Sequence, residues 1–488
     1  MSNTLQRIRE IRLKKLKHLQ IQGFNPFPSL AKRDYKISQA LKDFSKLSAQ
    51  KKEIYLVGRI IGWRTHGGAI FLDLKDESSK IQLFLKKDKI GEKAFELFEK
   101  CFDIGDFLQV RGNLIKTKVG EKTLEISGFK ILTKSLRPLP EKWHGLQDIE
   151  ERYRKRYLDL IFNSEVKEKF KRRAEIIKLL REFLERKEFL EVETPILQPL
   201  YGGARARPFK TYLNALKMNL YLRISPELYL KRLLIGGFEK IYELGKCFRN
   251  EGIDRFHNPD FTMLEVYWAY VDYREMMKLI EEMFKWLLKK IFNKITLKYQ
   301  GEEINFKTPW QRIDFFQFFK HNLKIDYEII NREGLINVAK KLNLKIEKEA
   351  SKVKIADEIF KKHLLPEIRQ PTFVLHYPLG FQLLAKTFEK NSLKLANFQL
   401  MVAGAELING FSELNDPLEQ EKRFKEQEKL IQKGLEEIQK KDKHFLEALE
   451  CGMPPAAGFG LGIDRLIALL TNSHSLREVM LFPTMRQK

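Results

Sequence analysis

The stretch KCFRNEGIDRFHNPDFTMLEVYWAY, residues 246–270, places two arginines and a histidine among acidic and aromatic side chains. A strand or helix of this composition would bury charge unfavourably unless polar groups filled the site. The stretch therefore indicates a binding site in which cations, carboxylates and exposed aromatic rings act together.

The size and charge of the chain limit the classes of protein to consider. Its 488 residues are too many for one hydrophobic core, so we expect two or three domains. Lys and Arg exceed Asp and Glu by 90 to 65, a net charge of +25, which favours a polyanionic partner such as nucleic acid. Lysine is spread along most of the chain, so a general bias in composition is an alternative explanation.

The cysteines and the apolar runs indicate the compartment. Cys101, Cys247 and Cys451 lie far apart and form no CxxC pair, which argues against a disulfide framework and against a zinc site. No apolar run approaches the roughly 18 residues of a membrane span, and the N-terminal segment lacks the apolar core of a signal peptide. We therefore expect a cytoplasmic protein without a membrane partner.

The first 50 residues are predicted to form a basic helix and a lead-in. Residues 4–20 carry one apolar stripe opposite a face of Arg and Lys, and the Gly and Pro residues within 23–29 end the helix. Two interpretations are open: a helix that docks on the next domain, or an electrostatic arm for a nucleic-acid backbone.

Residues 51–135 have the pattern of a small β-barrel. Five short β-branched or aromatic runs are interrupted after the third by a helical pattern at 91–102, which is the arrangement of an OB-fold that binds single-stranded nucleic acid. Phe71 falls on the second run and Gln82 on the third, where a ring could stack on a base and an amide could read its edge. Taken alone, Phe71 is more typical of a barrel core than of a stacking platform.

In the remaining chain, from residue 136 onward, the pattern of apolar residues has longer periods than in the barrel segment. We expect a linker at 136–164, then a domain at 165–488 that contains a helical insertion at about 310–365. Within that domain the pattern predicts helices at 165–188 and 415–441 and strands at 189–197, 371–378 and 381–388. No GxxxxGK[ST] string occurs, so side chains rather than a P-loop would hold phosphates.

Three blocks, at 191–209, 246–270 and 458–470, resemble motifs 1, 2 and 3 of class II aminoacyl-tRNA synthetases. The chain also resembles the lysine–tRNA ligase family almost throughout, outside 310–365, in LRPLPEKWHGL, RYRKRYLDLI, GGARARPF, PELYLKRL, FRNEGID, HNPDFTMLEVY, NGFSELNDP and GIDRLIALLTNSHSLREVMLFP. The resemblance implies an α+β fold, with an N-terminal OB-fold barrel and an antiparallel sheet flanked by helices. It also implies a homodimer through about residues 165–196.

The same resemblance implies a reaction and its residues. The class activates an amino acid with ATP, releases pyrophosphate and transfers the aminoacyl group to tRNA, chemistry that depends on cations placed around phosphate. A guanidinium suits this task because it binds phosphate and carboxylate in a fork. The implied catalytic residues are Arg249, Glu251 and Arg465, and the implied ATP site adds His257, Asn258, Phe261 and Glu406. Each of these residues also has a plain structural explanation when taken singly.

Lysine would need carboxylates for its ammonium and an apolar wall for its stem. The resemblance implies a pocket of Gly203, Glu227, Arg249, Glu265, Tyr267, Asn409, Phe411 and Glu413. An acidic amino acid would instead require a cation at the end of the pocket. By the same carry-over, Phe71, Gln82 and Glu121 would recognise the anticodon of lysine tRNA.

One departure from the family pattern concerns Mg²⁺, which the resemblance implies together with ATP. The segment 397–416 reads NFQLMVAGAELINGFSELND, so Glu406 is retained, but Gln399 stands where a metal-binding acid is expected and Asn397 where an arginine is expected. Residues 382–386 read QLLAK instead of SPLAK. A glutamine offers Mg²⁺ an oxygen but no charge, so we expect weaker metal binding. Two alternatives stay open: a catalytically weakened RNA-binding or regulatory paralogue, and a ligase that attaches lysine to protein.

Overall fold

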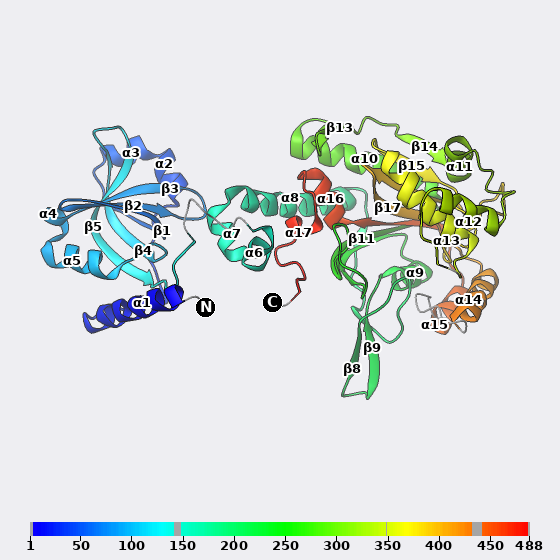
Figure 1. The fold of residues 1–488 in the computed structure, drawn as a ribbon, viewed down its shortest axis with the longest axis horizontal. Coiled ribbons are helices and arrows are strands. Elements are labelled where there is room, and N and C mark those ends of the chain that lie inside the picture. The colour runs from blue at the N-terminus through cyan, green and yellow to red at the C-terminus, as the bar shows by residue number, and fades with distance from the viewer. Residues whose placement is uncertain (1–2, 141–147, 348, 432–441, 487–488) are drawn as a thin grey trace. The chain divides into compact units, whose positions relative to one another are not determined.

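The computed structural model describes residues 3–140, 148–347, 349–431 and 442–486. The chain divides into two compact units, Met1–Gln147 and Asp148–Lys488, each of which is described by itself (Figure 1). The part of the predicted linker at 141–147 lies outside the described residues.

The N-terminal unit is a closed five-stranded barrel, as the sequence predicts. The strand order is β1-β2-β3-β5-β4, with β3 and β5 parallel and the other pairs antiparallel. Alternate residues of β1 such as Ile54 and Leu56 are buried, which explains the period of two in the sequence. The elements are α1 (Asn3–Ile21), α2 (Ile37–Lys42), α3 (Phe44–Ala49), β1 (Ile54–His66), β2 (Ala69–Lys75), β3 (Lys80–Lys86), α4 (Lys87–Ile90), α5 (Glu92–Cys101), β4 (Phe107–Lys116) and β5 (Lys122–Thr133).

Helix α1 docks on this barrel through one face. Leu19 is fully buried, and the Arg12 guanidinium donates hydrogen bonds to the carbonyls of Ser135 at 2.9 Å and Ile104 at 3.1 Å. Lys15 forms a 2.7 Å ion pair with Asp103. The docking interpretation therefore holds for this face, while Arg7, Arg9, Lys14 and Lys17 are exposed on the rest of the helix.

The C-terminal unit is built on an eight-stranded sheet of order β14-β15-β16-β17-β18-β11-β10-β6, in which only the pairs β14/β15 and β10/β6 are parallel. Its strands are β6 (Leu190–Glu191), β10 (Lys240–Phe248), β11 (Asp260–Ala269), β14 (Gln311–Asp314), β15 (Thr372–Leu375), β16 (Asn397–Val402), β17 (Ala405–Ser412) and β18 (Ala456–Gly462). Smaller sheets join β7 (Leu197–Gln198), β8 (Lys210–Leu213) and β9 (Met218–Leu222), and β12 (Thr296–Tyr299) with β13 (Glu302–Asn305).

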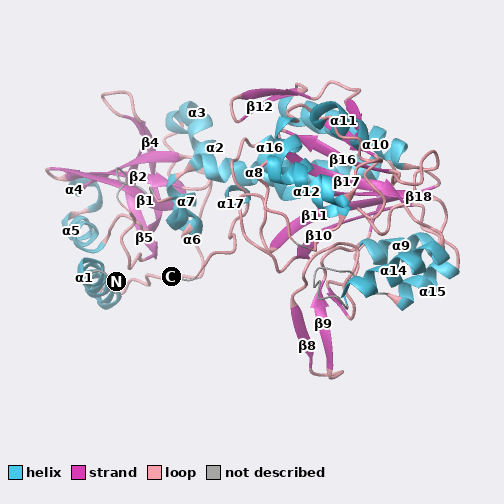
Figure 2. Cartoon of the chain, turned by 45° about the vertical axis from the view of Figure 1, so that its right-hand side comes forward, coloured by secondary structure: helices cyan, strands magenta, loops and turns pink. Residues whose placement is uncertain are grey.

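Helices cover this sheet (Figure 2). They are α6 (Ile149–Arg154), α7 (Arg156–Phe162), α8 (Ser164–Arg186), α9 (Glu227–Ile235), α10 (Tyr273–Phe292), α11 (Phe315–Leu323), α12 (Arg332–Lys341), α13 (Lys352–Ile359), α14 (Pro417–Ile431), α15 (Lys443–Glu450), α16 (Ile463–Leu470) and α17 (Leu476–Val479), with short turns of helix at Phe360–Leu364 and Leu365–Glu367. The main hydrophobic core lies between the sheet and helices such as α8, α10 and α16. Among the residues that the structure describes, no helix is both long enough and apolar enough to cross a membrane.

The two faces of β11 have different neighbours. Leu264 and Val266 belong to the main core with residues of α8, α10 and α16, whereas Tyr267 packs in a separate cluster with residues of α9 and α15. Successive side chains of a strand point to opposite faces. The acidic and aromatic side chains at positions 265 and 267 therefore lie on the face away from the main core.

Three sequence predictions of secondary structure were wrong in detail. The strand predicted at 189–197 is reduced to β6 and β7, because Pro195 between them cannot donate to a ladder. Residues 381–388 form no strand and make only isolated bridges, of Ala385 with Glu413 and of Thr387 with Leu395, since this apolar run is buried by packing and not by ladder pairing. The insertion predicted to be helical begins with a strand, β14. Helix α14 starts at Pro417, as predicted, and the rest of the predicted helix, 432–441, lies outside the described residues.

Candidate active site

Gly458 of β18 makes room for side chains of the neighbouring segments. Gly458 pairs with Tyr267 of β11 on one side and with Phe411 of β17 on the other. A Cβ atom at Gly458 would lie 2.6 Å from the Tyr267 ring and 2.7 Å from Oε1 of Glu413, which real Cβ atoms do not tolerate. The glycine-rich pattern of this strand therefore makes room for the side chains of its neighbours.

Three buried glutamates gather beside that space. Glu227 begins α9, Glu265 lies on β11 and Glu413 follows β17; they are 6%, 4% and 1% exposed. The Ser225 hydroxyl and the Tyr267 phenol donate hydrogen bonds of 2.7 and 3.0 Å to Glu265. The three glutamates are among the residues that the sequence predicts for the lysine pocket, and the fold brings them together from three separate segments.

Burial shifts the ionisation of these acids. Burial, reinforced by the charge of Glu227, raises the pKa of Glu265 to about 7. Burial likewise raises the pKa of Glu413 to about 8, although the neighbouring ammonium of Lys231 opposes the shift. Carboxyls with these values accept a proton readily when no cation occupies the pocket, and lose it when one does.

Lys231 is absent from the residues that the sequence predicts for this site. Its side chain is fully buried, and its Nζ lies 2.7 Å from Oε1 of Glu227 and 2.5 Å from Oε2 of Glu413. The available signal was the spacing of four residues from Glu227 on an apolar helix, which places both side chains on one face. Gly203 adjoins the group: with φ of +83°, its Cβ would lie 2.9 Å from Cβ of Glu227.

Arg249 directly follows the last residue of β10 and lies next to Phe261. Its guanidinium carbon lies 5.0 Å over the centroid of the Phe261 ring, and its Nε is buried without a hydrogen-bond partner among the described residues. A buried guanidinium N–H without an acceptor is rare in the absence of a ligand. Glu251, two residues further on, is exposed.

A second group of predicted residues meets at the start of α16. Arg465 donates a hydrogen bond of 2.8 Å to the carbonyl of Glu406, and its guanidinium lies 3.2 Å from Nε2 of His257. His257 in turn contacts Asp254 at 2.8 Å through Nδ1. The amide of Asn258 is held by the carbonyl of Asp260 at 2.6 Å, while its Oδ1 is buried without a donor among the described residues.

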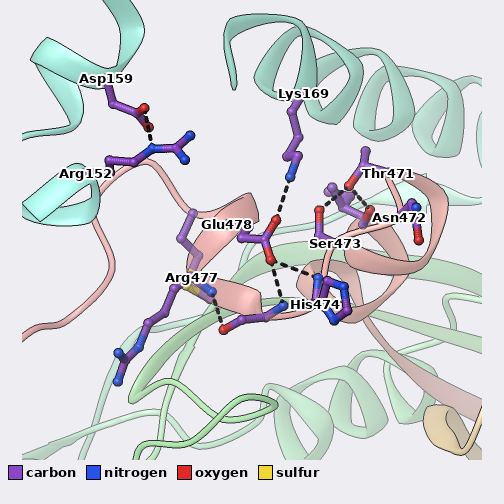
Figure 3. A network of polar contacts seen from close by, with 12 residues as sticks. Arg152, Asp159, Lys169, Thr471, Asn472, Ser473, His474, Arg477 and Glu478 are labelled. Carbon is purple, nitrogen blue, oxygen red and sulfur yellow. Dashed lines mark hydrogen bonds and ion pairs between the residues drawn. The ribbon is translucent and has the colours of Figure 1, made fainter. Parts of the chain in front are cut away.

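The loop that carries these residues is anchored on the turn before α17. Arg255 donates to the carbonyl of His474, and the backbone N–H groups of His474 and Ser475 donate to Glu478 at 2.9 and 3.2 Å. Lys169 of α8 closes the chain of contacts with a 2.9 Å ion pair to Glu478 (Figure 3). The sequence does not predict this support for the loop.

The residues that depart from the family pattern lie on β16 and the segment before it. The Gln382 amide donates to Asn409 at 2.7 Å and accepts from Asn397 at 2.8 Å, so two of the unusual residues contact one another and a predicted lysine-binding residue. Gln399 pairs with Asn409 across β16 and β17 and is 4% exposed. Gln382 and Asn397 thus form, together with Asn409, a neutral, hydrogen-bonded row of amides.

The donor set for a metal is small. Among the described residues no group of three or more His, Cys, Asp or Glu side chains could hold a metal ion. Glu406 and the neutral oxygen of Gln399 nevertheless fit an ion that arrives with a nucleotide, because Mg²⁺ is bound through one or two carboxylates and substrate phosphates.

In the barrel unit the predicted nucleic-acid residues lie on or beside β2 and β3. Phe71 stacks on Phe84 with centroids 4.6 Å apart, outside the core cluster to which its neighbours on β2 belong. Gln82 accepts a hydrogen bond of 3.1 Å from Arg64 and donates one of 2.9 Å to Thr123. Glu121 is exposed in the turn before β5. The alternative that Phe71 belongs to the barrel core is therefore wrong.

Comparison with known families defines the class. Residues 148–486 match the family described as tRNA synthetases class II (D, K and N), and residues 54–132 match the OB-fold nucleic acid binding domain of the anticodon-binding type. Both the sheet that carries the candidate site and the barrel thus lie within the matched residues.

Individual relatives narrow the class. The lysine–tRNA ligases of Carboxydothermus hydrogenoformans and Moorella thermoacetica are each 46% identical to the chain over 98% of its length, covering 98% and 97% of those proteins. That of Clostridium novyi is 47% identical over 97% of the chain and 94% of the relative. The chain therefore belongs to the lysine–tRNA ligase family of the class II tRNA synthetases.

Proposed function

We propose that the protein joins L-lysine to the 3′ end of lysine tRNA with consumption of ATP. The lysine carboxylate attacks the α-phosphate of ATP, pyrophosphate leaves, and the lysyl group passes from the adenylate to the tRNA with release of AMP. The observation that carries the proposal is the pocket of buried glutamates beside Tyr267 and Phe411, because it fits a long cationic side chain.

Within that pocket we assign each end of lysine to different groups. Glu265, Tyr267 and Glu413 take the side-chain ammonium, and Phe411 covers the aliphatic stem. Glu227 and the backbone of Gly203 take the α-ammonium, and Asn409 and Arg249 take the carboxylate. Oε1 of Glu413 is buried without a hydrogen-bond donor among the described residues, while Oε2 is paired with Lys231, and the free oxygen supports the presence of a cationic ligand there.

We assign the nucleotide to the cationic side of the site. Arg249 neutralises the α-phosphate during attack, and its unpartnered Nε supports that role. Arg465 and Phe261 hold the adenine and its phosphates, His257 and Asn258 reach the outer phosphates, and Glu251 completes the loop. Glu406, with a weaker contribution from Gln399, would hold Mg²⁺, which when bound neutralises phosphate charge.

The barrel and the outer surface complete the proposal. Phe71, Gln82 and Glu121 recognise the anticodon, with the Phe71–Phe84 pair as the stacking platform. The chain forms a homodimer through about residues 165–196; the exposed Leu190 and Ile196, 51% and 44% accessible, support an apolar contact there. Cys101, Cys247 and Cys451 are free thiols, as a reducing cytoplasm requires.

Charging of purified tRNA with labelled lysine tests the proposal. We expect lysine tRNA to be charged when ATP and Mg²⁺ are present, and Phe71→Ala to reduce charging without changing the formation of adenylate. Folded protein that binds lysine tRNA but charges none would support the catalytically weakened paralogue. Transfer of lysine to protein and not to tRNA would support the third alternative.

A further inference from the structure

Lys231 is a cation enclosed in the pocket that is proposed to bind a cation. It lies on α9, is fully buried, and its Nζ bridges Glu227 and Glu413 at 2.7 and 2.5 Å. Its ammonium also lies 5.3 Å from the Phe411 ring centroid. A buried ammonium is costly unless carboxylates surround it, so these contacts hold the three side chains in one arrangement.

The charges of the pocket show what this arrangement provides. Without Lys231 the three glutamates would lie together with no buried counterion of their own, and like charges at close range favour protonation. A protonated carboxyl is a poor partner for the side-chain ammonium of lysine. With Lys231 present, the ionised form of Glu413 is accessible. Burial alone would lower the pKa of Lys231, but the carboxylates of Glu227 and Glu413 outweigh burial and raise it.

The geometry points to Lys231 as a positioning residue for lysine recognition: it orients Glu227 and Glu413 and favours their ionised forms for the substrate. This inference rests on the proposed function, because it assigns a role inside the proposed lysine pocket. Lys231 does not contact the reacting atoms and is not assigned a part in phosphoryl chemistry.

Two carboxylates face this ammonium directly, Glu227 on its own helix and Glu413 after β17. Glu265 on β11 acts electrostatically on both of these carboxylates, Tyr267 interacts with all three glutamates, and Arg249 after β10 acts on Glu265. Of these, Glu265 and Glu413 have pKa values raised by burial to about 7 and about 8. Removal of the Lys231 charge raises the pKa of Glu413 further, so the pocket needs a higher pH to bind lysine.

The test compares wild type with Lys231→Met in lysine-dependent ATP–pyrophosphate exchange from pH 6 to 9. We expect the KM for lysine to rise about tenfold or more at pH 7, since one pKa unit corresponds to a factor of ten. We expect the pH midpoint of kcat/KM for lysine to move upward by about one unit, while kcat at saturating lysine and the KM for ATP change little. Arg232→Met is the matched control, because Arg232 pairs with Asp442 at 2.8 Å on the same helix.

The outcomes separate the inference from the proposed function. A higher KM for lysine without a shift of the pH midpoint would mean that Lys231 only fills space, and would overturn the inference. An unchanged KM for lysine in a folded Lys231→Met protein would overturn it as well. If the Met variant does not fold, Lys231→Gln, which retains hydrogen-bonding groups, is the second variant. The same upward shift of the pH midpoint of kcat/KM for lysine is expected, and a pH profile equal to that of wild type overturns the inference. Failure of wild type to bind lysine in calorimetry would instead contradict the proposed function itself.

Discussion

The phenol of Tyr267 donates a hydrogen bond of 3.0 Å to the carboxylate of Glu265, two residues earlier on β11. The two side chains share one face of the strand because residues i and i+2 point the same way. Ser225 donates to the other oxygen at 2.7 Å, so the carboxylate is fixed in orientation before any ligand binds. This fixed carboxylate is only 4% exposed.

Replacement of that carboxylate by an amide is expected to weaken lysine binding. Glu265→Gln keeps the shape of the side chain but removes the charge opposite the ammonium, so the KM for lysine should rise about ten- to a hundredfold. The KM for ATP should stay the same. Steady-state pyrophosphate exchange measures both values, with Glu282→Gln at the exposed ion pair to Lys187 as control. An unchanged KM for lysine would remove Glu265 from the pocket.

Two glycines of β18 give a matched pair of variants. A Cβ at Gly458 would lie 2.6 Å from the Tyr267 ring, whereas one at Gly460 would lie 3.7 Å from its nearest atoms in Glu265 and Met263. Gly458→Ala is therefore expected to displace Tyr267 and raise the KM for lysine about tenfold, and Gly460→Ala to leave it near wild type. Equal effects of the two substitutions on lysine binding, measured by calorimetry, would contradict the packing described for this strand.

The raised pKa values predict how stability depends on pH. Glu265 and Glu413 ordinarily titrate near 4.5, and burial raises their pKa to about 7 and about 8 in the folded protein. Between pH 4.5 and these raised values the folded state therefore binds more protons than the unfolded state. The free energy of unfolding falls as pH rises through this range, and the contribution of the two protonated carboxyls is lost by the time pH has passed 7 and 8.

Thermal melts of ligand-free protein from pH 6 to 8.5 measure this loss. Tm is expected to fall more steeply for wild type than for Glu265→Gln, and added lysine should raise Tm more at pH 8 than at pH 6. Parallel curves for the two proteins would show that Glu265 keeps its ordinary pKa.

Gln399 gives a prediction about metal. Gln399→Glu places a second carboxylate on β16, the strand that pairs with the strand of Glu406, and should lower the Mg²⁺ concentration for half-maximal adenylate formation severalfold. The titration is made at fixed ATP with lysine in excess. The hypothesis that metal binding here depends on Glu406 and the ATP phosphates is wrong if the Mg²⁺ dependence of the variant matches wild type.

The sequence predicts those parts of the fold whose side chains alternate or repeat. The strands of the barrel are predicted because burial on one face imposes a period of two. Residues 381–388 were mispredicted, since an apolar run is equally compatible with a buried loop. Lys231 was missed because a lysine on a helix usually faces solvent, and only tertiary contacts with Glu413 show that it does not.

The most direct measurement of the central claim is ATP–pyrophosphate exchange by the wild-type protein with lysine, aspartate and asparagine in turn. The buried carboxylates Glu265 and Glu413 predict exchange with lysine and none above background with the other two, because neither aspartate nor asparagine has a cationic side chain to offer them. Exchange with aspartate or asparagine, or no exchange with lysine by folded protein, would contradict the assignment of the pocket.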